Sequence, residues 1–345
     1  MRFVVTGGAG FFGSVLLQYL AEAGHEVLSI DCLVDEELDK QYFTAQVDIT
    51  DRELLKHTIK TFGKVDGIFH LAAVLAHDRK RFARLQATNV NGTHNVMEIA
   101  RELGIPKVVF TSSNCVFATN FDKAVDESAP TSPAEEYGKS KLAAEEVIVS
   151  YDGTVDGVII RCPTIIAAGR LGLLTILFDF VREGRRLYVL GSGDNRYSFI
   201  HARDLANACL LAMTSERTGI YHIGSDAVPT IRQLYSGLAD FAGTRARLVT
   251  FPAQAGLLAL QGLHLLGLSP LGPYHYRMLA SNFVLDTTKA KKELNWSPTK
   301  TNLDMLCEAY TFYTEHIDEL RANKGRSPHR SLARAGILNL LKWIS

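Results

Sequence analysis

The first half of the chain alternates short apolar runs, rich in β-branched residues, with longer stretches of helical periodicity. The runs FVVT, EVLSI, FTAQV, GIFHL, KVVFT and GVIIR are spaced as successive strands, and amphipathic stretches separate most of them. Strands that alternate with helices form parallel sheets with helices on both faces. The pattern therefore predicts an α/β fold: a doubly wound parallel sheet with a smaller, mostly C-terminal lobe.

A glycine-rich sequence, TGGAGFFG from Thr6 to Gly13, follows the first of these runs. Gly8, Gly10 and Gly13 fit the spacing GxGxxG between a strand and a helix, which is the context of a Rossmann-type dinucleotide-binding turn. Glycine permits the tight turn and lets backbone N–H groups approach a pyrophosphate at the helix N-terminus. Glycine turns after strands are common, so the motif alone also fits a purely structural turn.

Asp31 ends the second predicted strand, 18 residues after Gly13. A carboxylate near this spacing accepts hydrogen bonds from the ribose hydroxyls in the adenosine half of a dinucleotide. It would repel a 2′-phosphate, and no arginine follows it closely, so the sequence favours NAD over NADP. A carboxylate that caps a turn is the alternative interpretation.

These observations predict three parts of the chain. Residues 1–165 form an NAD-binding Rossmann domain, to which later segments near 196–225 and 282–290 return. Residues 166–320 form a substrate-binding lobe, because the alternation of strands and helices becomes irregular there. Residues 321–345 form a basic amphipathic tail without acidic residues. One large α/β domain with an appended lobe accounts for the length of 345 residues.

Composition argues against several classes of partner. Basic and acidic residues number 37 each, so no overall charge steers the chain toward nucleic acid or an anionic membrane. The five cysteines are scattered without a CxxC pair, and we expect no metal site. The N-terminus enters a strand directly, so we predict a cytoplasmic protein without a signal peptide. The tail is compatible with weak contact to a membrane surface, with capping of a dimer interface, or with packing on its own domain.

Further motifs accompany the glycine turn: VDITD from Asp48, HLAA from His70, NVNGT from Asn89 and, late in the chain, DTTKAKKELNWSP. Together they resemble the short-chain dehydrogenase/reductase superfamily, and specifically its extended branch of sugar-nucleotide epimerases, dehydratases and related reductases. The match runs from Arg2 to about Ser297. The resemblance implies that NAD is bound by Gly7, Gly10, Phe11, Phe12, Gly13, Asp31, Cys32, Asp48, Ile49, Leu71, Ala72, Ala73, Asn89, Tyr137, Lys141 and Pro163.

Tyr137 and Lys141 lie four residues apart in YGKSK, so on a helix they share a face. A tyrosine with a pKa near 10 is a poor base, and a nearby ammonium is expected to lower that pKa. Ser113 matches the family's serine or threonine that hydrogen-bonds the reacting oxygen. The resemblance implies that Tyr137 accepts the hydroxyl proton as hydride passes to NAD. Taken alone, YxxxK is also a common pattern on exposed helix surfaces.

The residues after Ser113 limit which reaction types are expected. Family members that dehydrate sugar nucleotides usually have an acidic residue there, whereas this chain has Asn114 and Cys115. The sequence therefore predicts oxidation, reduction or epimerisation rather than 4,6-dehydration.

The predicted lobe gives mixed signals about the substrate. Arg196 and Arg277 fit clamps for a nucleotide diphosphate, although either also fits an ordinary surface arginine. Thr164 stands where sugar-nucleotide families commonly have asparagine. An apolar run from Pro252 to Pro273 resembles the branch that contains 3β-hydroxysteroid dehydrogenases, and we expect a buried or lid helix there. The predicted substrate-binding residues are Ser113, Asn114, Thr164, Arg196 and Arg277.

Three hypotheses follow for function. The first is an NAD-dependent epimerase that acts on a nucleotide-linked sugar through a transient keto intermediate. The second is a 3β-hydroxysteroid dehydrogenase-like oxidoreductase that uses NAD(P) on a sterol or other lipid alcohol. The third is a non-catalytic NAD-binding subunit. The resemblance also implies a homodimer, formed by the helices around Asn95 and Tyr137.

Overall fold

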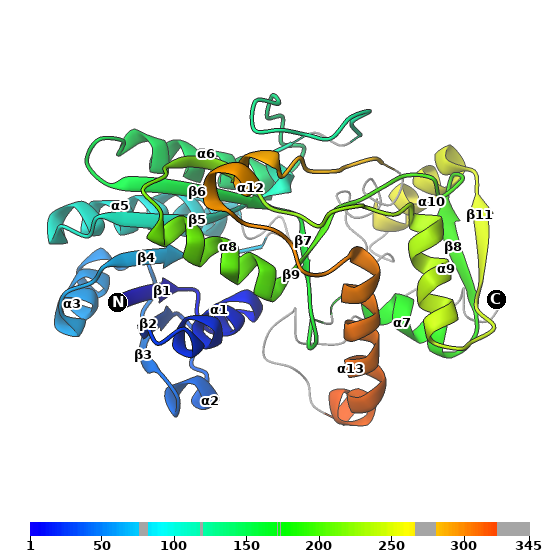
Figure 1. Ribbon diagram of the computed structural model, residues 1–345, viewed down its shortest axis with the longest axis horizontal. Helices are drawn as coiled ribbons and strands as arrows, with labels where there is room; N and C mark the ends of the chain where they lie inside the picture. Colours follow the sequence, from blue (N-terminus) through cyan, green and yellow to red (C-terminus); the bar gives the residue numbers. More distant parts are fainter. Residues whose placement is uncertain (76–81, 118–119, 171, 173, 266–280, 323–345) are drawn as a thin grey trace.

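The computed structural model describes residues 1–75, 82–117, 120–170, 172, 174–265 and 281–322. Its larger part is built on a seven-stranded sheet in which every strand pair is parallel (Figure 1). The order is β10-β6-β5-β4-β1-β2-β3. The strands are β1 (Arg2–Thr6), β2 (Glu26–Asp31), β3 (Phe43–Gln46), β4 (Gly67–His70), β5 (Lys107–Ser113), β6 (Asp156–Cys162) and β10 (Gly219–His222). The predicted Rossmann-type doubly wound sheet is therefore confirmed.

Helices cover both faces of this sheet (Figure 1). Successive residues of β1 point to opposite faces: Phe3 and Val5 join one buried core with Leu16 and Leu205, whereas Val4 joins the other. Each fully buried aliphatic side chain contributes about 1.5–3 kcal/mol. One face carries α1 (Phe11–Glu22) and α8 (Ala202–Thr214), and the other carries α3 (Arg52–Phe62), α5 (Gly92–Leu103) and α6 (Glu136–Ser150).

Local sequence signals set the ends of these helices. The side chain of Asp51 caps α3 by accepting from the backbone N–H of Leu54 at 3.1 Å. α5 ends at Gly104, whose φ of 65° is a left-handed conformation that glycine adopts readily. Short elements lie between the longer ones: α2 (Glu36–Asp39), α4 (Phe82–Leu85), a π-helix (Gln86–Asn91) and a 3₁₀ turn (Asn114–Val116).

The smaller lobe packs at one end of the sheet (Figure 1). Its core includes Phe178, Leu234, Leu238 and Tyr313. Two parallel pairs, β8 with β11 and β7 with β9, supply its strands. Its elements are β7 (Thr164–Ile166), α7 (Leu174–Arg182), β8 (Arg186–Leu190), β9 (Phe199–His201), α9 (Ile231–Phe241), β11 (Arg247–Phe251), α10 (Ala253–Leu265) and α13 (Asn302–Ala322).

Segments late in the chain pack against the larger part of the molecule, which contains the seven-stranded sheet. β10 pairs with β6, and α8 packs on α1. After α12 (Thr288–Leu294), the fully buried Trp296 donates from Nε1 to the carbonyl of Asp204 on α8 at 2.9 Å. The exact division into 1–165 and 166–320 stays a prediction.

The structure describes only part of two regions singled out above. α10 covers the first part of the apolar run from Pro252 to Pro273, and the rest of the run lies outside the described residues. Leu258 on α10 is 68% exposed, so the expectation of a buried helix is wrong there and the lid interpretation stays open. Arg277 and residues 323–345 of the tail also lie outside the described residues. No described helix combines the length and hydropathy needed to cross a membrane.

Candidate active site

The glycine-rich turn lies between β1 and α1, at the carboxyl end of the sheet. Gly7 has a φ of 80°, and its N–H donates to the carbonyl of Ile30 at 2.7 Å. A Cβ on Gly7 would lie 2.7 Å from the backbone nitrogen of Ala72, and a Cβ on Gly13 would lie 2.2 Å from the carbonyl oxygen of Gly7. Only glycine therefore allows the turn to close against the next loop.

The N-terminus of α1 is suited to an anion. Gly10 precedes the helix, no side chain caps it, and the first turn contains no acidic residue. The N–H groups and the dipole of a helix N-terminus favour a phosphate. Phe11 and Phe12 begin the helix and are buried, so they fix its position against the sheet. This arrangement fits the pyrophosphate of a dinucleotide.

Asp31 lies beside this turn at the end of β2. Its carboxylate accepts from the backbone N–H of Ala9 at 3.1 Å and from that of Leu33 at 3.0 Å. A cavity of about 240 Å³ adjoins it, and its described lining contains the carboxylates of Asp31, Asp35 and Asp39 and no lysine or arginine. Such a cavity suits neutral ribose hydroxyls and disfavours a 2′-phosphate.

Asp31→Asn is expected to weaken NAD binding roughly tenfold, because hydrogen bonds to a charged acceptor are the stronger ones. The loss of charge should also reduce the preference for NAD over NADP. Titration calorimetry with both dinucleotides measures the two changes. Asp35→Asn is the matched control, because Asp35 lines the same cavity but caps α2 by accepting from Glu37 N at 3.2 Å. If the ratio of the NAD and NADP affinities were unchanged in Asp31→Asn, Asp31 would not bind the ribose.

The other predicted cofactor residues follow the neighbouring strands. Asp48 accepts from the N–H and the hydroxyl of Thr50, and Ile49 is buried. The N–H of Leu71 donates to the carbonyl of Thr6 at 3.0 Å, which fixes the loop containing Ala72 and Ala73 beside the glycine turn. Two further predicted cofactor residues directly follow strands: Cys32 follows β2 and is exposed, and Pro163 follows β6 and is buried. Direct contact of these residues with NAD stays a prediction.

Asn89 has a structural role in this arrangement. Its side-chain oxygen accepts from Val74 N at 2.7 Å, and its amide nitrogen donates to Val74 O at 3.1 Å and to Ser140 Oγ at 2.9 Å. The amide thus joins the loop after β4 to α6. Direct contact of Asn89 with NAD stays a prediction.

Ser113, Tyr137 and Lys141 come from two elements that pack directly on each other. A Cβ on Gly138 would lie 2.1 Å from the carbonyl oxygen of Cys115, so the start of α6 touches the turn after Ser113. The Ser113 hydroxyl accepts from Cys115 N at 3.2 Å and lies 3.4 Å from Asn114 Oδ1. Within the described residues, no hydrogen bond joins the Ser113 and Tyr137 hydroxyls. The three residues share a region without forming a hydrogen-bonded triad.

The predicted electrostatic role of Lys141 is not what the structure shows. Lys141 is 3% exposed; its Nζ donates to the carbonyl of Thr111 at 2.7 Å and lies 4.2 Å from the ring centroid of Phe110. Burial lowers the pKa of Lys141 to about 8. Burial also raises the pKa of Tyr137, and the charge that opposes this rise belongs to Arg170. The expectation that Lys141 lowers the Tyr137 pKa is corrected accordingly.

A buried ion pair supports the catalytic helix. Glu145, one turn after Lys141, receives three hydrogen bonds from Arg161: Nη2 to Oε2 at 2.6 Å, Nε to Oε1 at 3.0 Å and Nε to Oε2 at 3.2 Å. Both side chains are 4% exposed, and Ser112 also donates to Glu145. The sequence analysis did not single out this pair. An arginine at the end of an otherwise apolar strand was the available signal, because a buried charge needs a partner.

The predicted substrate residues come from different elements. Asn114 is buried and donates from Nδ2 to the Tyr197 hydroxyl, which belongs to the lobe core. Thr164 begins β7 and is half-buried. Arg196 is exposed, and its guanidinium donates to the carbonyl of Val228. Thr164 pairs with Phe199, two residues after Tyr197, so β7 and the turn after β5 both pack against the segment that follows Arg196.

Two buried histidines are expected to make the stability of the folded chain depend on pH. His70 lies between Thr6 Oγ1 at 2.7 Å and Thr93 Oγ1 at 2.9 Å, and His222 Nδ1 donates to Val125 O at 2.9 Å. Burial lowers the pKa of His70 to about 3 and that of His222 to about 4. Both rings therefore stay neutral in the folded chain at neutral and mildly acidic pH.

Acidification from pH 7 to 5 is expected to lower the free energy of unfolding by about 2 kcal/mol per buried histidine. The unfolded chain takes up protons near pH 6.5 and the folded chain does not until its lower pKa, so this contribution is present above pH 6.5 and is lost as pH falls. Urea titrations at pH 7, 6 and 5 measure it. His222→Gln should flatten the pH dependence, and the exposed His57→Gln should not. Equal slopes in the two variants would contradict this assignment.

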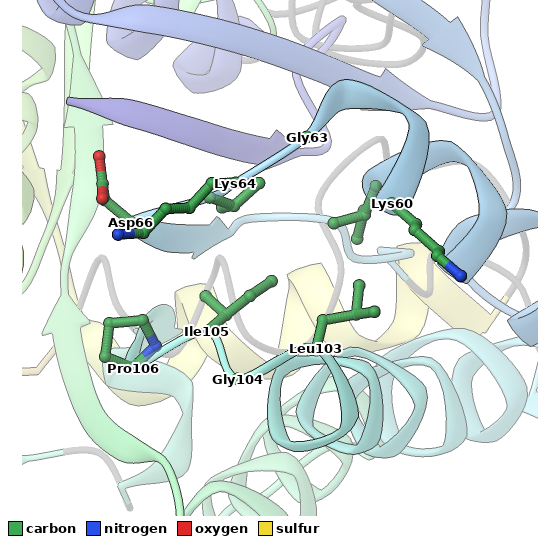
Figure 2. Close-up of a pocket in the computed structure, with 10 residues that line it drawn as sticks. Lys60, Gly63, Lys64, Asp66, Leu103, Gly104, Ile105 and Pro106 are labelled. Atoms are coloured by element: carbon green, nitrogen blue, oxygen red, sulfur yellow. The ribbon is translucent and has the colours of Figure 1, made fainter.

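A second cavity, of about 580 Å³, lies at the opposite end of the sheet (Figure 2). It is lined by the ends of α3 and α5, with Lys60 on α3, and by the loops that lead into β4 and β5, with Lys64, Asp66 and Pro106. None of the predicted site residues lines it. Among the described residues, no group of three His, Cys, Asp or Glu side chains is placed to hold a metal ion.

Comparison with known proteins identifies the family of this chain. Residues 3–224 match the model of the NAD dependent epimerase/dehydratase family. The chain belongs to this family. It is an extended short-chain dehydrogenase/reductase whose cofactor is NAD, and both predictions are confirmed. The glycine turn, the uncapped α1 N-terminus and Asp31 are the features of this family member that fit the cofactor.

Its curated relatives include enzymes of two reaction types. The chain is 34% identical to an uncharacterised protein, y4nG, of Sinorhizobium fredii over 99% of this chain and 85% of the relative. It is 25% identical to a UDP-glucose 4-epimerase of Streptomyces lividans, over 91% of this chain and 97% of the relative. It is 30% identical to a dTDP-D-glucose 4,6-dehydratase of Mus musculus over 68% of this chain and 70% of the relative.

Solved structures agree on the fold. A UDP-glucose 4-epimerase from Thermotoga maritima, crystallised with UDP-glucose, has a TM-score of 0.76 at 23% identity and covers 92% of this chain and 100% of its own. The Bordetella bronchiseptica enzyme WbmG, in complex with NAD and UDP, has a TM-score of 0.73 at 22% identity, with coverage of 91% and 94%. The family establishes NAD-dependent epimerase or dehydratase chemistry, and it leaves the choice between the two reactions to residues of this chain.

Proposed function

We propose that this family member is an epimerase that inverts a secondary hydroxyl of a nucleotide-linked sugar through a transient ketone. The observation that carries the proposal is the pair Asn114 and Cys115 after Ser113. Elimination needs a carboxylate at this place in the family's dehydratases, and neither residue supplies one. The side chain of Asn114 is buried and bonded to Tyr197.

In the proposed reaction, the Tyr137 phenolate accepts the proton of the substrate hydroxyl. Ser113 donates a hydrogen bond to the oxygen that becomes the ketone. Lys141, one turn after Tyr137 on α6, would help to hold NAD, and Arg170 in the turn after β7 supplies the positive charge that favours the phenolate. NAD, which the glycine turn and Asp31 would hold, would supply the acceptor for the hydride and then the donor that gives it back. Inversion requires that the ketone turn its other face before the hydride returns, with Tyr137 giving back the proton.

The test is incubation of the NAD-loaded protein with UDP-, dTDP-, GDP- and CDP-sugars, with products separated by chromatography and assigned by NMR. We expect conversion of one substrate into its epimer without net formation of NADH. A 4-keto-6-deoxy product would contradict the argument from Asn114 and Cys115. Tyr137→Phe provides the inactive reference, because it lacks the proposed base.

The exposed apolar side of α10, with Leu258 at its surface, favours a second candidate. A lipid-alcohol dehydrogenase would have an apolar helix at the substrate entrance. The same assay distinguishes it: a sterol or other lipid alcohol would give stoichiometric NADH, and no sugar nucleotide would be converted. Absence of turnover with both classes would favour the third hypothesis, a non-catalytic NAD-binding subunit. Assembly as a homodimer and a cytoplasmic location remain part of the proposal.

A further inference from the structure

Arg170 is a cation beside the glycine-rich turn that the sequence motifs do not include. It follows β7 in a turn where its N–H donates to the carbonyl of Ala167 at 3.0 Å and where Gly169 has a φ of 78°. Its guanidinium carbon lies 5.3 Å from the ring centroid of Phe11. Phe11 is the first residue of α1, so the guanidinium is close to the helix N-terminus.

The charge of Arg170 has no counter-charge in the described part of the chain. No described carboxylate forms an ion pair with it, and no described acceptor receives a hydrogen bond from its side chain. The side chain is only partly exposed, and its pKa, lowered by burial to about 10, leaves it charged at neutral pH. A partly buried charge without a partner is unfavourable, so an anion that binds next to it gains affinity.

The position of Arg170 relative to Phe11 and Tyr137 limits which anion can bind beside it. The guanidinium contacts the ring of Phe11, and its charge opposes the rise in the Tyr137 pKa that burial causes. The adenosine ribose is expected at Asp31 and the nicotinamide at Tyr137. The part of NAD that lies between them, at the N-terminus of α1, is the pyrophosphate.

We propose that Arg170 binds the pyrophosphate of NAD and closes the cofactor cleft from the side opposite the glycine turn. The planar fork of a guanidinium donates two parallel hydrogen bonds to phosphate oxygens. The ring of Phe11 supports the guanidinium through a cation–π contact. The proposal rests on the family's NAD site and on the predicted place of Tyr137, and it is independent of which sugar or alcohol is the substrate.

Binding measurements test this assignment without turnover. Arg170→Met removes the charge and keeps the length, and titration calorimetry would compare NAD, ADP-ribose and adenosine. We expect NAD and ADP-ribose to bind roughly 10- to 100-fold more weakly and adenosine to bind within about twofold of the parent. Arg170→Lys should give an intermediate loss, because it keeps the charge and loses the fork. Arg186→Met, at an exposed arginine of β8, is the matched control.

Three outcomes would overturn the proposal. Unchanged affinity for NAD and ADP-ribose in Arg170→Met would show that Arg170 does not contact the pyrophosphate. An equal loss for adenosine would indicate a structural role, and the melting temperature without ligand would record it. Unchanged NAD affinity with weaker binding of UDP, dTDP or GDP would assign Arg170 to the substrate. The amount of NAD retained through purification, measured after acid release, gives a second readout and should fall in Arg170→Met.

Discussion

Tyr137→Phe is expected to lower turnover roughly 1000-fold, the size of a general acid–base contribution, while NAD affinity stays within about twofold. The substitution removes one hydroxyl and keeps the ring, so packing around α6 should be retained. No described side chain accepts a hydrogen bond from this hydroxyl, so its removal leaves no polar partner unsatisfied. Single-turnover reduction of NAD and NAD titration measure the two quantities separately.

The pH profile adds a second readout for Tyr137. Burial raises the pKa of this phenol above its usual value, so the phenolate is the minor form at neutral pH. The rate of substrate oxidation by the parent should therefore rise with pH through the neutral and mildly alkaline range. In Tyr137→Phe the residual rate should lose this dependence.

Tyr151 provides the control for this substitution. It terminates α6 at the end opposite Tyr137, and its hydroxyl donates to Glu98. Tyr151→Phe should retain most of the turnover. If Tyr137→Phe also kept more than about a tenth of the parent rate, the proton would be taken by another group.

Arg161→Met is expected to lower the free energy of unfolding by about 3–5 kcal/mol. The substitution leaves Glu145 with a side chain that is 4% exposed and only the Ser112 hydroxyl as a described hydrogen-bond donor. A buried carboxylate without its cation must either stay charged at a high cost or bind a proton. Urea titration at neutral pH, with the slope compared between variants, measures the loss.

Two further variants show whether this loss of stability comes from the isolated buried charge. Arg161→Met combined with Glu145→Leu should recover a large part of the loss, because no isolated charge remains. Arg203→Met is the matched surface control: Arg203 pairs with Glu22, and both side chains are more than 40% exposed. That change should cost less than about 1 kcal/mol. An effect of Arg161→Met no larger than that of Arg203→Met would mean that the buried pair adds little to stability.

The sequence predicted the sheet and the glycine turn well because both depend on local patterns. The alternation of apolar runs with helical stretches predicted helices on both faces of a parallel sheet, and the structure has two buried cores, one on each face. Asp31 could be found by its spacing from Gly13, since both ends of that interval belong to one βαβ unit.

The contacts of the catalytic residues could not be predicted in the same way. Lys141 donates to Thr111, 30 positions earlier, and Asn114 donates to Tyr197, 83 positions later. Such pairs depend on how the strands and the lobe pack, which no local period encodes. Arg170 was missed for the same reason, because its place beside Phe11 results from the turn after β7.

The hydrogen bond from Asn114 to Tyr197 has a mechanical consequence. Asn114 follows Ser113 at the end of β5, whereas Tyr197 packs in the core of the lobe. The two parts of the molecule cannot separate at this point without breaking this buried hydrogen bond, so it holds them together beside the reacting oxygen. Movements of the lobe that admit a substrate are therefore expected to be rotations about this point, with the largest displacement far from Ser113 and the smallest at the reacting oxygen.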